Sequence, residues 1–91
     1  MKKFRIFSAN YCSYCKQAIM TLTYKGAHYE VFDVSRNDVA RMLLAERTGK
    51  NTVPQIFFGD KHIGGCSDLL AMEESGELDI LIKGEENGEV H

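Results

Sequence analysis

Two cysteines three positions apart, Cys12 and Cys15, are the side chains of this sequence best placed to carry redox chemistry. They follow an alternating segment that ends near Ser8 and open a helical pattern, so the first thiol is expected at a helix N-terminus. Unpaired N–H groups and peptide dipoles at such an end favour the thiolate, the reactive form of cysteine. Cys12 is therefore the candidate nucleophile. Cys15 is the candidate resolving thiol, because it lies one turn later on the same face and can attack a mixed disulfide formed at Cys12.

A second feature is the one proline of the chain, Pro54, which directly precedes a segment that is typical of a buried strand. A proline at a strand start gives no N–H to the ladder, so the backbone of Val53 is free to pair with an incoming extended peptide. An ordinary proline at a strand edge explains the same pattern.

A third feature is the run Gly64-Gly65-Cys66-Ser67-Asp68, which lies between an expected strand and an expected helix. Paired glycines allow a ligand to approach the backbone closely, and a helix start offers N–H donors to an anion such as a carboxylate. Asp68 would suit an ammonium group beside that carboxylate. A plain turn followed by a helix cap accounts for the same residues.

The elements that must position these residues follow from hydrophobic periodicity. Residues 3–8 and 29–34 predict two parallel strands of a βαβ unit, while 55–58 and 61–64 predict an antiparallel hairpin joined by Gly59-Asp60. The crossover helix is expected from Cys12 to about residue 25, with an apolar stripe of Ala18, Ile19 and Leu22.

The remaining helices are predicted from less regular apolar patterns in the sequence. One begins after Ser35 or Asn37, ends near Gly49, and carries an apolar stripe of Val39, Met42 and Leu43. A further helix around residues 69–72 stops at Ser75-Gly76, and a last short one contains Leu78, Leu81 and Ile82. This order predicts an α/β fold, a four-stranded mixed sheet flanked by helices.

Composition limits the function classes. The chain has 91 residues, 44% of them hydrophobic, which is enough for one modest core; we expect one domain over residues 1–83 and a flexible acidic tail over 84–91. Three cysteines, an odd number, and no secretory signal predict a reducing cytoplasm. No apolar run is long enough for a membrane span, and a net charge of −2 does not favour nucleic acid as a partner. We expect a monomer.

Three motifs together carry a family resemblance. The segments 11–15 (YCSYC), 52–57 (TVPQIF) and 64–69 (GGCSDL) resemble those of the glutaredoxins in order and spacing, over nearly the whole chain. The resemblance implies a thioredoxin-like fold, a cis peptide bond before Pro54, and a glutathione groove between the dithiol, the proline loop and the glycine turn.

The resemblance also implies roles for individual residues. Val53 would pair its backbone with the cysteinyl part of glutathione, and Lys50 would anchor the glycyl carboxylate. Cys66, Ser67 and Asp68 would hold the γ-glutamyl end. The full implied glutathione set is Tyr14, Lys50, Thr52, Val53, Pro54, Gly65, Cys66, Ser67 and Asp68.

The activity implied by the resemblance is glutathione-dependent thiol–disulfide exchange. Cys12 and Cys15 would reduce protein–glutathione mixed disulfides and protein disulfides, with glutathione and the client proteins as partners. Two positions depart from the common pattern: Ser13 stands where many dithiol glutaredoxins have proline, and Ala9 stands where relatives have lysine. Because family members with serine at that position include some that bind a [2Fe–2S] cluster between two protomers, a cluster carrier or redox-sensing dimer with Cys12 as ligand is the alternative function.

Zinc is a further alternative, since Cys12, Cys15, His62 and Cys66 add up to a Cys₃His set on paper. A closed zinc site would leave the proline loop and the glycine turn without a use, so we prefer the redox interpretation. Cys66 is expected at a helix start or as a small packing residue. We assign no role to His28 and His62.

Overall fold

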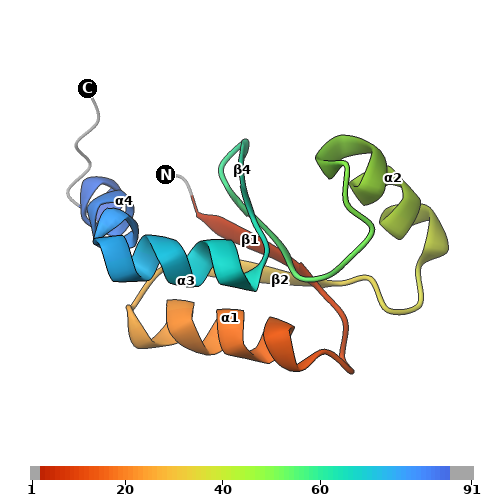
Figure 1. Ribbon diagram of the computed structural model, residues 1–91, viewed down its shortest axis with the longest axis horizontal. Helices are drawn as coiled ribbons and strands as arrows, with labels where there is room; N and C mark the ends of the chain where they lie inside the picture. The colour runs from red at the N-terminus through yellow and green to blue at the C-terminus, as the bar shows by residue number, and fades with distance from the viewer. Residues whose placement is uncertain (1–2, 87–91) are drawn as a thin grey trace.

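The computed structural model describes residues 3–86, which form four strands and four helices in the order expected (Figure 1). The elements are β1 (Phe4–Ser8), α1 (Ser13–Tyr24), β2 (Tyr29–Asp33), α2 (Asp38–Thr48), β3 (Gln55–Phe58), β4 (Lys61–Gly64), α3 (Cys66–Ser75) and α4 (Glu77–Glu86). No described helix has the length and apolar character needed to cross a membrane.

The sheet has the strand order β2-β1-β3-β4. β1 and β2 are parallel with Phe4 opposite Tyr29, whereas β1 pairs antiparallel with β3, which turns back into β4 through Gly59 at φ +63°. The predicted βαβ unit and hairpin are therefore confirmed. This topology places the end of β1, the start of β3 and the end of β4 at one edge of the sheet.

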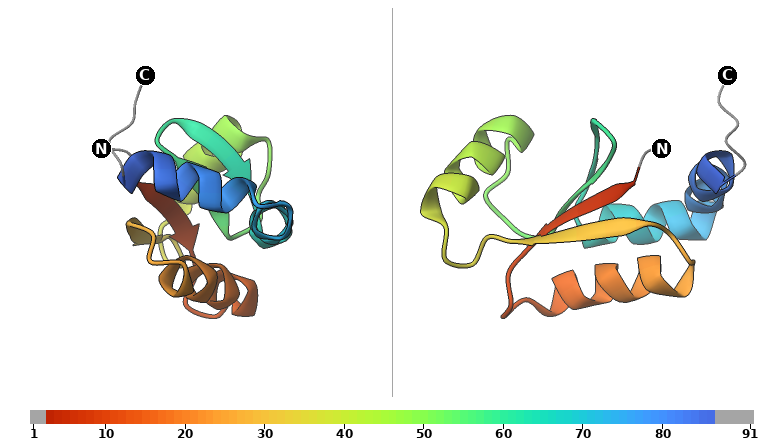
Figure 2. Two further views of the ribbon diagram at one scale, coloured as in Figure 1. Left: turned by 90° about the vertical axis from the view of Figure 1, so that its left-hand side faces the viewer. Right: turned by 180° about the vertical axis from the view of Figure 1, so that it is seen from behind.

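The core lies between one face of the sheet and the helices α1 and α3, which run side by side (Figures 1 and 2). Alternation along the strands turns Ile6 and Ile56 toward these helices. Ala18 and Leu22 of the predicted α1 stripe are buried there and Ile19 packs against them, so that prediction is confirmed. The core residues are Phe4, Ile6, Ala18, Leu22, Ile56, Phe58, Cys66, Leu69, Leu78 and Ile82.

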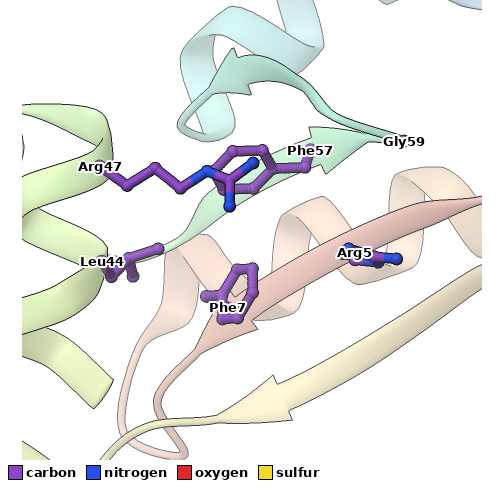
Figure 3. Close-up of a pocket in the computed structure, with 6 residues that line it drawn as sticks. All are labelled: Arg5, Phe7, Leu44, Arg47, Phe57 and Gly59. Atoms are coloured by element: carbon purple, nitrogen blue, oxygen red, sulfur yellow. The ribbon is translucent and has the colours of Figure 1, made fainter. Parts of the chain in front are cut away.

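The predicted apolar stripe of α2 is wrong, because Val39, Met42 and Leu43 are all exposed. The one buried residue of α2 is Leu44, which packs on the face of the sheet opposite α1 and α3. The Arg47 guanidinium lies over the Phe57 ring, 5.2 Å from its centroid. Figure 3 shows these side chains around a small pocket of about 280 Å³ that contains no cysteine. Only one narrow part of α2 touches the sheet, so an apolar stripe elsewhere on the helix remains uncovered.

Helix ends follow ordinary capping chemistry. The Asn37 side chain accepts from the N–H of Ala40 at 2.9 Å, and α2 ends at Gly49 in the left-handed conformation, as predicted. Gly76 ends α3 in the same way. α4 continues to Glu86, beyond residue 83 where we expected the domain to end, and residues 87–91 of the expected tail lie outside the described residues.

Candidate active site

Cys12 is the N-cap residue of α1. Its sulfur accepts a hydrogen bond from the N–H of Cys15 at 3.3 Å, and its own N–H donates to the Ala9 carbonyl. The side chain is half-buried, so a reagent can reach the sulfur. At the N-cap the sulfur lies beside the unpaired N–H groups of the first helical turn, one of which is that of Cys15. The prediction that Cys12 opens a helix is confirmed.

Cys15 has a different environment from Cys12. It is 1% exposed, and burial together with the neighbouring Cys12 sulfur raises its pKa to about 11. The two cysteines are therefore one half-buried and one fully buried thiol, joined by the hydrogen bond from the Cys15 N–H to the Cys12 sulfur. This asymmetry suits an attacking sulfur and a reserve sulfur that acts only after the first has reacted.

The proline loop lies against the dithiol. The peptide bond between Val53 and Pro54 is cis, as the resemblance implied, and the Cys12 thiol donates to the Val53 carbonyl at 3.6 Å. The Gln55 side chain supports this loop by donating to the Thr52 carbonyl at 3.0 Å. Its amide oxygen is 2.7 Å from a ring nitrogen of His62.

The start of α3 closes the third side of the site. The Asp68 carboxylate accepts from the N–H of Gly65 at 2.9 Å and so caps the helix. Gly64 has φ +127°, and a Cβ there would collide with the Asp68 carboxylate. Cys66 is buried at the first position of α3, and burial raises the pKa of its thiol. Cys66 is therefore a buried packing residue at the start of a helix, as expected.

These three segments line an open groove of about 730 Å³, which reaches Val53, the residue whose carbonyl contacts the Cys12 sulfur. The groove is lined by Tyr14, Thr52, Val53, Pro54, Gly65, Cys66 and Ser67, seven of the nine residues in the predicted ligand set. Of the other two, Lys50 lines a smaller neighbouring pocket with Thr52 and Val53, and Asp68 is engaged in capping α3.

Comparison with known proteins decides the family. The glutaredoxin family model matches residues 4–63. Glutaredoxin 3 of Escherichia coli is 39% identical over 83 residues, which cover 91% of this chain and all of that protein. The chain belongs to the glutaredoxin family.

Solved glutaredoxin structures share the fold. A buckwheat glutaredoxin in complex with glutathione superposes with a TM-score of 0.84 at 30% identity, covering 90% of this chain and 77% of that one. A glutaredoxin from Brucella melitensis gives 0.81 at 41% identity, covering 100% and 96%. This glutaredoxin therefore has the thioredoxin-like fold that the sequence predicted, and it is a thiol–disulfide oxidoreductase.

One residue at the site of this glutaredoxin was missed by the sequence analysis. Arg41 of α2 donates to the Tyr11 hydroxyl at 3.3 Å and to the Asn51 carbonyl at 3.4 Å, and it lines the same small pocket as Lys50. The signal was present, because Arg41, Leu44 and Thr48 share one helix face at spacings of three and four. The sequence analysis predicted instead that the stripe beginning at Val39 is buried, which would place Arg41 on the side of α2 away from the site.

Gln55 and His62 were also missed as supports of the proline loop, because their contact joins two strands whose pairing must be known first. The same contact argues against the zinc set. His62 is hydrogen-bonded to Gln55 and packs beside the Phe57 ring. Within the described residues no group of three or more His, Cys, Asp or Glu side chains is arranged to hold a metal ion.

Proposed function

We propose that this glutaredoxin reduces protein–glutathione mixed disulfides and protein disulfides with glutathione as the electron donor. The observation that carries the proposal is the position of the Cys12 sulfur. It caps α1 and contacts the carbonyl of Val53, which precedes the cis proline and lines the groove of about 730 Å³. An open groove lined by these residues suits a tripeptide, and the backbone of Val53 can pair with an extended peptide.

The groove offers complementary groups along the length of glutathione. The start of α3 presents N–H groups to the γ-glutamyl carboxylate, while Ser67 supplies a hydroxyl. At the other end Lys50 and Arg41 provide two positive charges for the glycyl carboxylate. Tyr14, which is exposed, lines the groove beside the dithiol.

For a glutathionylated client we propose two exchanges. The Cys12 thiolate attacks the glutathione sulfur of the mixed disulfide, a new Cys12–glutathione disulfide forms, and the client leaves as a thiolate that takes up a proton. A second glutathione thiolate then attacks the glutathione sulfur bound to Cys12. Oxidised glutathione leaves and the Cys12 thiolate is restored. Cys15 is not needed in this cycle.

For a protein disulfide we propose that Cys15 takes part. Cys12 attacks one client sulfur and the other leaves as a thiol. The Cys15 thiol, once deprotonated, attacks the Cys12 sulfur and releases the client sulfur that Cys12 had attacked, which takes up a proton. A Cys12–Cys15 disulfide remains for two glutathiones to reduce.

The test is turnover of a small glutathione mixed disulfide by the parent protein and by Cys15→Ser, with Cys12→Ser as the blank. We expect Cys15→Ser to keep most of the activity and Cys12→Ser to lose it. Equal loss in both variants would contradict the two-exchange cycle. An inactive parent that turns brown and doubles in mass on anaerobic reconstitution with iron, sulfide and glutathione would favour the [2Fe–2S] alternative, to which each chain would contribute Cys12.

A further inference from the structure

A second groove starts at Ser13, the residue after Cys12, and is not used by the glutathione site. It lies between α1 and α3, which run side by side in Figure 1, and is an open surface groove of about 990 Å³. Its wall on α1 contains Ser13, Lys16, Met20 and Tyr24, which form one stripe along the helix from the residue next to Cys12. Leu70 and Glu73 of α3 form the opposite wall. We call this surface the α1–α3 groove.

The α1–α3 groove exposes large apolar side chains that the core does not use. Met20 is 69% exposed and Tyr24 is 86% exposed, while Leu70 is half-buried between them and the core. Methionine and tyrosine grouped on one surface are typical of sites that bind other polypeptides, because both offer large contact areas that adapt to a partner.

The α1–α3 groove starts next to the dithiol. Tyr14 lines the glutathione groove and Ser13 lines the α1–α3 groove, and both residues lie between Cys12 and Cys15 in the chain. When glutathione occupies its own groove, a client that is disulfide-bonded to the glutathione sulfur must lie over a nearby surface that remains open. The α1–α3 groove is an apolar surface that starts at Ser13, next to Cys12.

We propose that the α1–α3 groove binds an extended segment of the client protein that flanks the reacting client cysteine. The proposal rests on the function proposed above and specifies which side chains near the client cysteine the groove would bind. Met20 is eight residues from Cys12 along α1, about 12 Å at 1.5 Å per residue. An extended client covers that distance in about four residues at 3.3 Å each, which places an apolar client side chain four positions from its cysteine.

The charges along the α1–α3 groove indicate a second property of the client segment. Lys16, one turn from Cys12, makes no ion pair among the described side chains, whereas Glu73 at the far end is paired with Lys25 at 2.9 Å. The end near the dithiol is therefore positive and suits an acidic client residue two positions from the cysteine. In an extended segment the cysteine and the residues two and four positions away share one face, so all three can meet the groove together.

The experiment compares two glutathionylated peptides with a small substrate. The first peptide has Glu two positions and Leu four positions from its cysteine on both sides, the second has Ser in place of Leu, and the small substrate is the glutathione–cysteamine mixed disulfide. We expect the parent protein to have about fivefold higher kcat/KM for the Leu peptide than for the Ser peptide, as partial burial of one leucine predicts. Equal values would overturn the proposal.

The variants locate the effect. Met20→Lys is expected to lower kcat/KM for the Leu peptide to the value of the Ser peptide and to leave the cysteamine substrate unchanged. Met42→Lys is the matched control, because Met42 is a 56% exposed methionine on α2, a helix that does not line this groove. An unchanged Leu-peptide value in Met20→Lys, or an equal loss in Met42→Lys, would contradict docking in the α1–α3 groove.

A binding measurement separates this proposal from the proposed function. The Leu peptide with its cysteine replaced by serine cannot react, so its binding to the full chain does not depend on turnover. We expect it to shift backbone amide NMR signals of α1 and of residues 70–73 in the parent and not in Met20→Lys. Shifts confined to other surfaces would overturn the proposal, whereas failure of the parent to turn over the cysteamine substrate would contradict only the proposed function.

Discussion

At the scale of single residues, the site depends on two cysteines of the same helix turn in unlike environments. Cys12 is half-buried and receives an N–H, whereas Cys15 is fully buried and keeps its proton at neutral pH. Once Cys12 is in a mixed disulfide its sulfur can no longer ionise, which removes the charge interaction that adds to the effect of burial in raising the pKa of Cys15. In the proposed route for protein disulfides, this change makes Cys15 easier to deprotonate when it must attack.

The raised pKa of Cys15 predicts how stability depends on pH. In the unfolded chain the thiol ionises near its ordinary value of 9.0, while in the folded protein it ionises near about 11. Above the first value the unfolded state binds fewer protons, so this contribution is complete below about pH 9 and is lost as pH rises toward 11. Urea unfolding of the reduced protein should show the advantage of the parent over Cys15→Ser shrinking across that window. Parallel pH profiles of the two proteins would contradict the assignment.

Support of the proline loop by His62 gives a second prediction at this scale. His62→Ala leaves the buried Gln55 amide oxygen without its partner, which we expect to cost about 1 kcal/mol of stability. Because Gln55 also holds Thr52, the KM for glutathione should rise. His28→Ala is the control, since the His28 side chain is exposed and distant from the loop. Similar KM values for the two variants would show that the His62–Gln55 contact does not position the loop.

At the scale of elements, the sequence predicted the helices and strands well, because each carries local signals. Asn37 caps α2, Gly76 ends α3, and the Gly59 turn joins the hairpin strands. The buried face of α2 could not be predicted, since Leu44 and the stripe containing Met42 both have helical spacing. Only the position of the sheet decides between them.

The candidate site, too, has parts that the sequence predicted and parts that it did not. Contiguous motifs around the dithiol, the proline loop and the glycine turn were read directly, since each lies within a few residues of sequence. The Arg41 contacts to Tyr11 and Asn51, and the Gln55 contact to His62, join residues from different elements. Such contacts depend on strand pairing and helix orientation, which no single motif specifies.

The turn before α3 gives a prediction that compares two neighbouring glycines. Gly64→Ala places a Cβ at φ +127° against the Asp68 carboxylate, so it should destabilise the protein by more than about 1 kcal/mol. Gly65→Ala meets only the Pro54 carbonyl at 3.5 Å, an ordinary contact, and should change stability much less. The free energies of unfolding from urea titrations measure both. Equal losses would mean that the carboxylate does not restrict Gly64.

At the scale of the whole molecule, the dithiol and the ion pairs that connect the helices lie at opposite ends of α1. The dithiol and the glutathione groove lie at the start of α1 and α3, the α1–α3 groove extends along α1 as far as Tyr24, and α4 runs across the other end of α3 (Figure 2). Lys25, directly after α1, connects these far ends, because its ammonium is 2.9 Å from Glu73 of α3 and 3.0 Å from Asp79 of α4. One cation therefore joins three helices at the end opposite the reactive thiol.

Lys25→Met tests whether this connection stabilises the molecule. We expect a lower Tm in low salt and a smaller loss in 1 M salt, because screening weakens the same ion pairs in the parent. The two carboxylates raise the pKa of Lys25, so its contribution is present below the ordinary lysine value of 10.5 and is lost as pH rises through the folded value. Lys61→Met is the control, since Lys61 is exposed on β4 and makes no ion pair among the described side chains. If Lys25→Met and Lys61→Met lowered Tm equally, or if salt left the difference unchanged, the ion pairs of Lys25 would not stabilise the packing of α4. If the prediction is correct, turnover of a small mixed disulfide at 25 °C should be the same in Lys25→Met and the parent, because the site at the opposite end is held by the proline loop and the cap of α3.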